Sequence, residues 1–252
     1  MRKRKNLVWK LALKMIEAQV SVAPRYQLTV KAREEVKKIV ESGDILLDCN
    51  SAFPCSQLMA GIFFKTYWIH SAMYVGNGVV IDSGRKSHVA EISLNDFLET
   101  TDAAVYRPQY VDQADREAAV AFVRKALGKP FNITFDDKNG KAYYCTQLIS
   151  DALTSMPHPI NLPRRQLFWK QVIPPASVAV CSQIVCVWSS HPSVVKSVLC
   201  HTPILAGALT GGVAALVLTG SNIWAGAIAG SFLTSRLMQT AVVTNRRRNI
   251  HE

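Results

Sequence analysis

The chain has 252 residues, of which 49% are hydrophobic and 19% are charged, a composition that supports a buried core and excludes a wholly disordered protein. Its net charge of +11 comes from residues 1–41 and 191–252, because the charges of residues 42–190 cancel. A nucleic-acid-binding fold carries its basic patch on the folded body, so this distribution argues against a nucleic-acid partner. The six cysteines are scattered and follow no secretory signal, which predicts free thiols in a reducing compartment.

Residues 1–41 form the first predicted segment, a basic and helical one. Apolar residues recur at helical spacing between Val8 and Ile16, Pro24 ends that helix, and a second, highly charged helix is expected to stop at Gly43. Two interpretations stay open for the first helix. It packs on the domain, or it lies as a basic amphipathic helix on an anionic membrane.

Residues 42–190 form the second segment, in which short apolar runs alternate with turn residues. The Asn77-Gly78 pair predicts a two-residue hairpin and therefore an antiparallel sheet, with Asp82 opposite Met73. Asp112 is expected to cap a helix that Gly128 stops, and another helix is expected to begin near Cys145. The strand candidates are Asp44–Cys49, Ser71–Gly76, Val79–Asp82, Ala103–Arg107 and Val178–Trp188.

Residues 191–252 form the third segment, in which the run from Ser197 to Ser235 contains no Asp, Glu, Lys or Arg. Its length and the break at residues 220–222 predict a transmembrane helical hairpin. The alternatives are a single span, a shallow or re-entrant insertion, and a buried helical pair in a soluble oligomer. Small residues at four-residue spacing allow close helix packing and a homo-oligomer: Gly207, Gly211, Gly226 and Gly230. The basic residues 246–248 place the C-terminus, and with it the folded body, on the cytoplasmic side of a membrane.

Three residues of the middle segment suit nucleophilic catalysis. Cys145 stands at an expected helix N-terminus, where the peptide dipoles stabilise a thiolate. His70 precedes one strand of the hairpin and Asp82 ends the other, so a base and its orienting carboxylate would meet near one end of the hairpin. In the expected register, their contact requires a bend or a bulge. Such a site needs neither a metal nor an organic cofactor.

The chain from about residue 42 to 190 resembles the permuted papain-like amidases of the YaeF/YiiX family, in the NlpC-like clan. The resemblance rests on the segments SGDILLD, HSAMYVGNGVVID, GKPF at residues 128–131 and YCTQL at residues 144–148, which occur in the family's order. It implies an α+β, circularly permuted papain-like domain with a small antiparallel sheet. Gln147 departs from the family pattern, in which a Glu is frequent at that position.

The resemblance also implies roles for single residues. Cys145 matches the nucleophile, His70 the base and Asp82 the residue that orients the base, while the Cys145 backbone N–H, and more weakly Tyr144, would serve an oxyanion hole. A hydrophobic C-terminal anchor is also found in the related lecithin:retinol acyltransferases, which act on acyl-lipid bonds. That parallel is an architectural analogy.

We therefore expect a thiol-dependent hydrolase or acyltransferase that acts on an amide or ester bond of an acylated substrate presented by membrane lipid. A cell-wall peptide amidase is the second hypothesis. A membrane-embedded assembly protein that keeps the fold without catalysis is the third.

Overall fold

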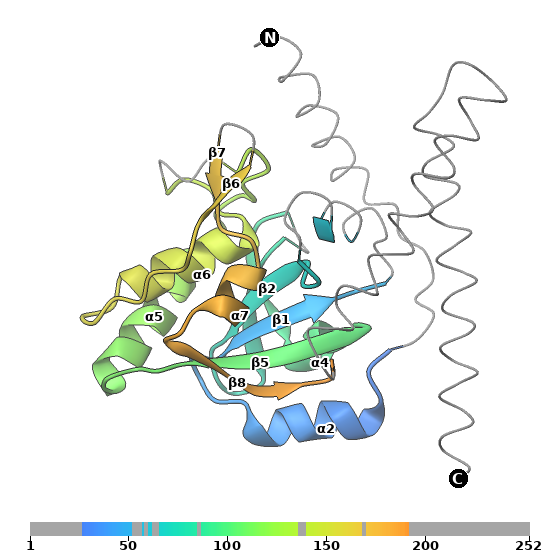
Figure 1. Ribbon diagram of the computed structural model, residues 1–252. Coiled ribbons are helices and arrows are strands. Elements are labelled where there is room, and N and C mark those ends of the chain that lie inside the picture. The colour runs from blue at the N-terminus through green and yellow to red at the C-terminus, as the bar shows by residue number, and fades with distance from the viewer. Residues whose placement is uncertain are drawn as a thin grey trace, which may run out of the picture. The chain divides into compact units, whose positions relative to one another are not determined.

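The computed structural model describes residues 27–51, 57, 60–61, 66–84, 87–135, 140–167 and 170–191 (Figure 1). Its helices are α2 (Val30–Ile39), α4 (Leu94–Phe97), α5 (Gln113–Lys125), α6 (Cys145–Thr154) and α7 (Ala176–Val180). Its strands are β1 (Ile45–Cys49), β2 (His70–Tyr74), β3 (Val79–Ser83), β4 (Val89–Ser93), β5 (Asp102–Pro108), β6 (Arg165–Leu167), β7 (Lys170–Val172) and β8 (Ile184–Ser189).

A six-stranded sheet in the order β4-β3-β2-β1-β5-β8 forms the centre of the domain. All of its neighbouring strands pair antiparallel, which confirms the arrangement predicted from the hairpin signal. Antiparallel pairing places His70, Cys49 and Asp102 at one end of the sheet, where β1 ends and β2 and β5 begin. We call this the His70 end.

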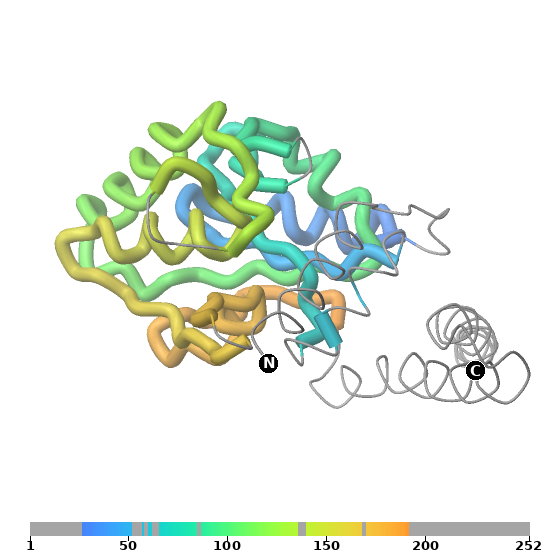
Figure 2. The backbone as a smooth tube through the Cα atoms, turned by 90° about the horizontal axis from the view of Figure 1, so that it is seen from above, coloured from blue at the N-terminus to red at the C-terminus, as the bar shows by residue number. Residues whose placement is uncertain are grey.

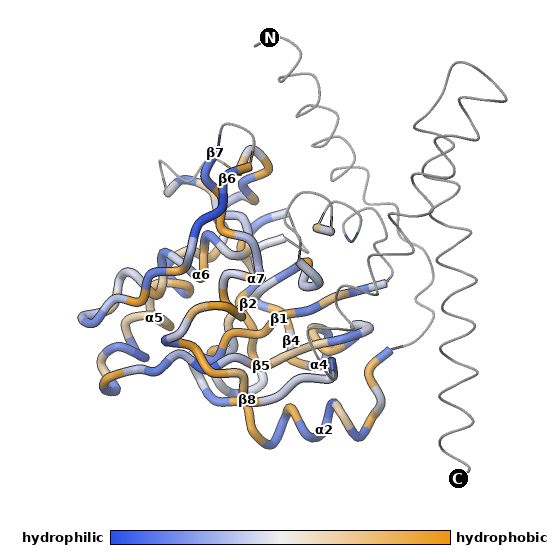
Figure 3. Tube along the Cα trace, viewed as in Figure 1, coloured by the Kyte–Doolittle hydropathy of each residue, from blue (hydrophilic) through white to orange (hydrophobic). Residues whose placement is uncertain are grey.

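Helices cover both faces of the sheet. Every residue of β1 is buried, and alternate residues enter separate cores: Ile45 and Leu47 pack with residues of α5 and α6, whereas Leu46 packs with residues of α2 and α4. α5 and α6 lie side by side on their face (Figures 1 and 2). α2, on the other face, alternates hydrophobic and hydrophilic residues along its turns (Figure 3). The result is a three-layer α+β domain.

The β2–β3 hairpin differs from its predicted register by one residue. The Val75 N–H donates to the Val79 carbonyl, so three residues with positive φ, at 76–78, form the connection. Asp82 consequently lies opposite Ala72, and the prediction that it faces Met73 is wrong. Because side chains alternate along a strand, this shift places Asp82 and His70 on the same face without a bulge.

The predicted Val178–Trp188 strand is also wrong in part. Pro175 opens the short helix α7, since its ring holds φ at a helical value, and β8 begins only at Ile184. The strands β4, β6 and β7 were not predicted from the sequence. The helices beginning at Gln113 and Cys145 are confirmed, with Asp112 as the side-chain cap of α5.

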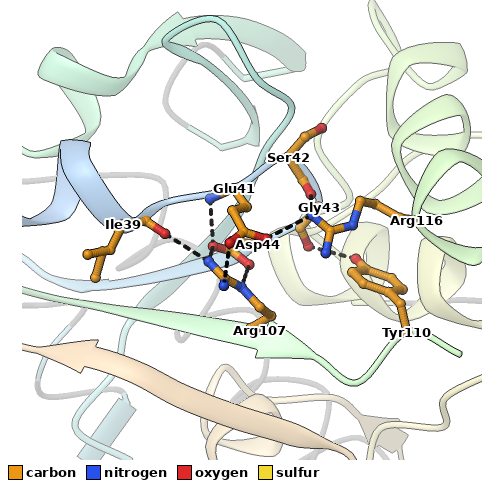
Figure 4. A network of polar contacts seen from close by, with 8 residues as sticks. All are labelled: Ile39, Glu41, Ser42, Gly43, Asp44, Arg107, Tyr110 and Arg116. Carbon is orange, nitrogen blue, oxygen red and sulfur yellow. Dashed lines mark hydrogen bonds and ion pairs between the residues drawn. The ribbon is translucent and has the colours of Figure 1, made fainter. Parts of the chain in front are cut away.

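The helix α2 ends at Ile39, four residues before the predicted stop at Gly43, because the backbone becomes extended at Val40; a polar network holds the Ile39 carbonyl (Figure 4). Arg107 on β5 donates Nε and Nη2 to the two carboxylate oxygens of Asp44, each at 2.8 Å. The same guanidinium donates to the Ile39 carbonyl at 2.8 Å and to Glu41 at 2.7 Å. Arg107 thereby joins α2, the start of β1 and the end of β5.

Replacement of Arg107 is expected to destabilise the domain. Arg107→Met leaves the fully buried Asp44 carboxylate without its guanidinium, so the free energy of unfolding in urea should fall by about 3 kcal/mol. Arg124→Met is the matched control, because its ion pair with Glu91 has side chains 45% and 48% exposed and should contribute less than about 1 kcal/mol. Equal losses from the two variants would contradict this prediction.

Two predicted segments lie outside the described residues: the N-terminal helix before residue 27, and the C-terminal hairpin with its glycines. Within the residues that the structure describes, no helix has the length and apolar character required to span a bilayer.

Candidate active site

The Cys145 thiol stands on the first residue of α6, at the His70 end of the sheet. The residue before it is held by Gln147, whose Oε1 accepts the Tyr144 backbone N–H at 3.4 Å and the Asn132 side-chain amide at 3.0 Å. Gln147 is completely buried. These contacts place the half-buried thiol at the positive end of the helix dipole.

His70 and Asp82 form the second part of the site. The Nε2 atom of His70 lies 2.6 Å from Oδ1 of Asp82, and their side chains are 16% and 1% exposed. Because Nε2 is engaged with the carboxylate, Nδ1 is the ring nitrogen that remains for Cys145. Burial alone would lower the pKa of His70, but the adjacent Asp82 carboxylate and the Cys145 sulfur raise it well above its ordinary value.

The Cys145 and His70 side chains interact and change each other's protonation. Burial would raise the pKa of the Cys145 thiol, yet hydrogen bonding to His70 and the charge of His70 lower it below its ordinary value. A lowered thiol pKa and a raised imidazole pKa together favour a thiolate–imidazolium pair. The structure thus brings the three predicted residues into one chain of contacts from Asp82 through His70 to Cys145.

Tyr144 lies immediately before Cys145 and is 2% exposed. Its hydroxyl accepts a hydrogen bond from the Ile173 backbone N–H at 3.1 Å, and its ring lies 5.0 Å from that of Phe135. These contacts fix the residue that leads into α6. Its assignment to an oxyanion hole stays a prediction.

Residues next to the predicted site were missed by sequence reasoning. Ser71 follows His70 and its hydroxyl donates to Thr146, which follows Cys145, at 3.1 Å. Ser83 follows Asp82, and its hydroxyl donates to the Tyr143 carbonyl at 2.6 Å. The sequence signal that could have identified Ser71 and Ser83 is that they directly follow the candidates His70 and Asp82. Each hydroxyl ties a strand of the hairpin to the segment that carries Cys145.

One group of possible metal ligands occurs within the described part of the chain, formed by Asp112, Asp115 and His158 with ligand atoms within 4.8 Å of one another. Asp112 caps α5, and Asp115 accepts the backbone N–H groups of Val111 and His158. The group follows the end of β5 at Pro108, opposite the His70 end. Its carboxylates therefore serve the start of α5, and it is separate from the Cys145 site.

Comparison with known proteins agrees with this arrangement. The model of a family described as permuted papain-like amidase enzyme, YaeF/YiiX, C92 family, matches residues 39–206. The chain belongs to this family. Membership of the C92 family makes it a permuted papain-like amidase, as the resemblance predicted, and in its sequence the candidate base His70 precedes the candidate nucleophile Cys145.

The fold of this C92 amidase is similar to a solved structure of YiiX from Escherichia coli O157:H7, which is described as a metalloprotein. The two share 13% sequence identity with a TM-score of 0.52, and the match covers 60% of this chain and 98% of YiiX. At that identity the likeness supports the fold alone. No curated protein matches the sequence of this chain.

Gly84 provides room for the His70 ring. A Cβ atom there would lie 3.3 Å from Cε1 of His70, and the backbone has a φ of +150°. Gly84→Ala should push the imidazole away from its position and lower amidase turnover about 10²-fold. Gly78→Ala is the control, since its φ is +74° but a Cβ there meets nothing within 4 Å. Turnover that falls equally in both variants would show backbone strain, not contact with His70, to be the cause.

Proposed function

We propose that this amidase is a thiol-dependent hydrolase or acyltransferase in which Cys145 attacks an amide or ester carbonyl. His70 would serve as acid and base, and Asp82 would hold the ring and its tautomer. One observation carries the proposal: His70 bridges the buried Asp82 carboxylate, at 2.6 Å, and a thiol whose pKa it lowers.

The chemistry begins from the thiolate–imidazolium pair. The Cys145 sulfur forms a bond to the carbonyl carbon, and the imidazolium gives its proton to the leaving nitrogen or oxygen as the C–N or C–O bond breaks. The thioester then accepts water or another nucleophile, which gives a proton to His70 as the C–S bond breaks. The sulfur leaves as thiolate, so the starting pair is restored.

The start of α6 can stabilise the oxyanion of this reaction. The first N–H groups of a helix have no partner within the helix, and the Cys145 N–H is the first of α6. A backbone N–H at this position points its partial positive charge toward an oxygen bound beside the sulfur.

We further propose that the substrate is acylated and presented at a membrane. The uncharged run at residues 197–235 supports this choice. The contacts of Ser190 and His191, the last described residues before that run, support it too. Ser190 donates to Asp102 at 2.8 Å, and the ring of His191 lies 4.3 Å from that of Tyr67, all at the His70 end. β8 is the third strand from β2, so the end of β8, which Ser190 and His191 follow, lies roughly 14 Å from the strand that carries His70.

Turnover of two amide probes tests the proposal on the full chain. An N-acyl phosphatidylethanolamine in phosphatidylcholine vesicles and a short soluble N-acyl peptide are each incubated with the wild type, Cys145→Ala and Cys186→Ala. We expect cleavage of the vesicle probe by the wild type and by Cys186→Ala, and none by Cys145→Ala.

Each other outcome counts against part of the proposal. Equal turnover of the soluble peptide and the vesicle probe would contradict presentation of the substrate at a membrane and favour the peptide amidase hypothesis. Turnover by Cys145→Ala would refute the assignment of Cys145 as the nucleophile. An unreactive Cys145 with neither probe cleaved would favour the assembly protein.

A further inference from the structure

A pair of buried hydroxyl groups, those of Thr146 and Ser71, lies next to the Cys145 sulfur. The Thr146 hydroxyl oxygen is 3.7 Å from the sulfur, a distance within hydrogen-bond reach for sulfur. The Ser71 hydroxyl donates to that same oxygen at 3.1 Å. Thr146 and Ser71 are both completely buried.

The direction of the Ser71–Thr146 hydrogen bond determines that of the Thr146–Cys145 hydrogen bond. Each hydroxyl has one proton, and the Ser71 proton is directed at the Thr146 oxygen. The Thr146 proton is then available for the sulfur. The backbone N–H of Ser71 also points to the sulfur, where it helps to lower the pKa of Cys145. Because the Ser71 and Thr146 side chains are buried, such aligned donors interact more strongly with a charge than they would in solvent.

We propose that Ser71 and Thr146 form a hydroxyl relay that stabilises the Cys145 thiolate independently of His70. In this relay Thr146 contacts the nucleophile, and Ser71 is a positioning residue that acts through Thr146. The relay deepens the proposed function, because it assumes that the thiolate is the reacting species. It assigns the start of β2 two tasks: residue 70 carries the base and residue 71 orders the donors to the sulfur.

The pH dependence of Cys145 alkylation tests the relay. Full-length wild type, Thr146→Val, Thr146→Ser and Ser71→Ala are treated with iodoacetamide between pH 5 and 9, and the modified peptide is quantified by mass spectrometry. We expect Thr146→Val to move the alkylation profile to higher pH and to slow the reaction at pH 6 about tenfold, the effect of one pKa unit. Thr146→Ser keeps the hydroxyl and should restore the wild-type profile.

Ser71→Ala separates a relay from two independent effects. It should shift the profile in the same direction as Thr146→Val, and by less. Adding it to Thr146→Val should cause no further shift, because Ser71 acts through the Thr146 oxygen. Ser150→Ala is the matched control: it removes another buried hydroxyl of α6, more than one turn beyond Cys145, and should leave the profile unchanged.

The outcomes distinguish failure of the relay from failure of the proposed function. If wild-type Cys145 reacts at low pH and Thr146→Val does so equally well, or if Ser150→Ala causes the same loss, the relay is refuted while the thiol site stands. If wild-type Cys145 titrates as an ordinary thiol, the proposed function is refuted with it. Thermal unfolding followed by circular dichroism identifies variants that fail to fold, and Thr146→Ser then decides between loss of the hydroxyl and loss of the fold.

Discussion

His70→Ala should slow alkylation of Cys145 at pH 6 about 10²-fold and reduce turnover about 10⁴-fold. Burial raises the pKa of the Cys145 thiol, and the interaction with His70 is the principal opposing effect. Without the imidazole, the pKa of the thiol rises, so the thiolate is scarce at pH 6. Turnover falls further than alkylation does, because iodoacetamide needs only a thiolate, whereas the amide also needs a proton for its leaving group.

Other cysteines of the same chain provide internal controls for this prediction. Burial raises the pKa of Cys186, although its side chain is exposed, and it raises the pKa of the fully enclosed Cys49 much further. The expected order of alkylation in the wild type at pH 6 is therefore Cys145, then Cys186, then Cys49. The prediction is refuted if His70→Ala leaves this order and the Cys145 rate unchanged.

Asp82→Asn should narrow the pH range of activity from both sides and lower turnover at neutral pH about 10²-fold. The negative charge of Asp82 raises the pKa of His70, so its loss lowers that pKa and moves the alkaline limb of the profile to lower pH. Fewer imidazolium ions then face Cys145, the pKa of the thiol rises, and the acid limb moves to higher pH. The measurement is the dependence of kcat/KM on pH for both proteins.

The asparagine keeps one function of the carboxylate, because its amide oxygen still accepts from the Nε2–H of His70. Asp82→Ala removes both the charge and the acceptor and should cost more. If the Asn and wild-type profiles superimpose, the charge of Asp82 has no part in forming the ion pair. If Asp82→Asn and Asp82→Ala lose activity equally, the hydrogen bond that holds the His70 ring contributes nothing to turnover beyond the effect of the Asp82 charge.

Several features could be derived from local sequence because local physics decides them. The Asp112 side chain caps the following helix wherever that helix packs. That helix ends at Lys125, and Gly128, three residues later, has a φ of +80°. The Cys145 helix begins where its sequence indicates. The residues of the candidate site could be chosen for a related reason: a thiol at a helix N-terminus has its electrostatic setting within a few residues of itself.

The connection between β2 and β3 shows where local sequence was insufficient. Asn77-Gly78 permits a two-residue turn, and the same residues with Gly76 permit a three-residue one. The observed three-residue connection is the one that places the side chains of Asp82 and His70 on one face, where they make their contact. β6 and β7 were missed because runs of three residues carry little periodicity, and pairing with a partner strand defines them.

The sequence by itself determined the antiparallel pairing of the hairpin, the helix that carries Cys145, and the choice of His70 and Asp82 as candidates for the base and its carboxylate. Only the tertiary structure decided the one-residue register that joins Asp82 to His70, the end of α2 at Ile39, and the Ser71–Thr146 contact next to the sulfur. The physical reason is range: caps and dipoles act within one turn of a helix. The Ser71–Thr146 bond, in contrast, spans 75 residues and exists only once β2 has packed against α6.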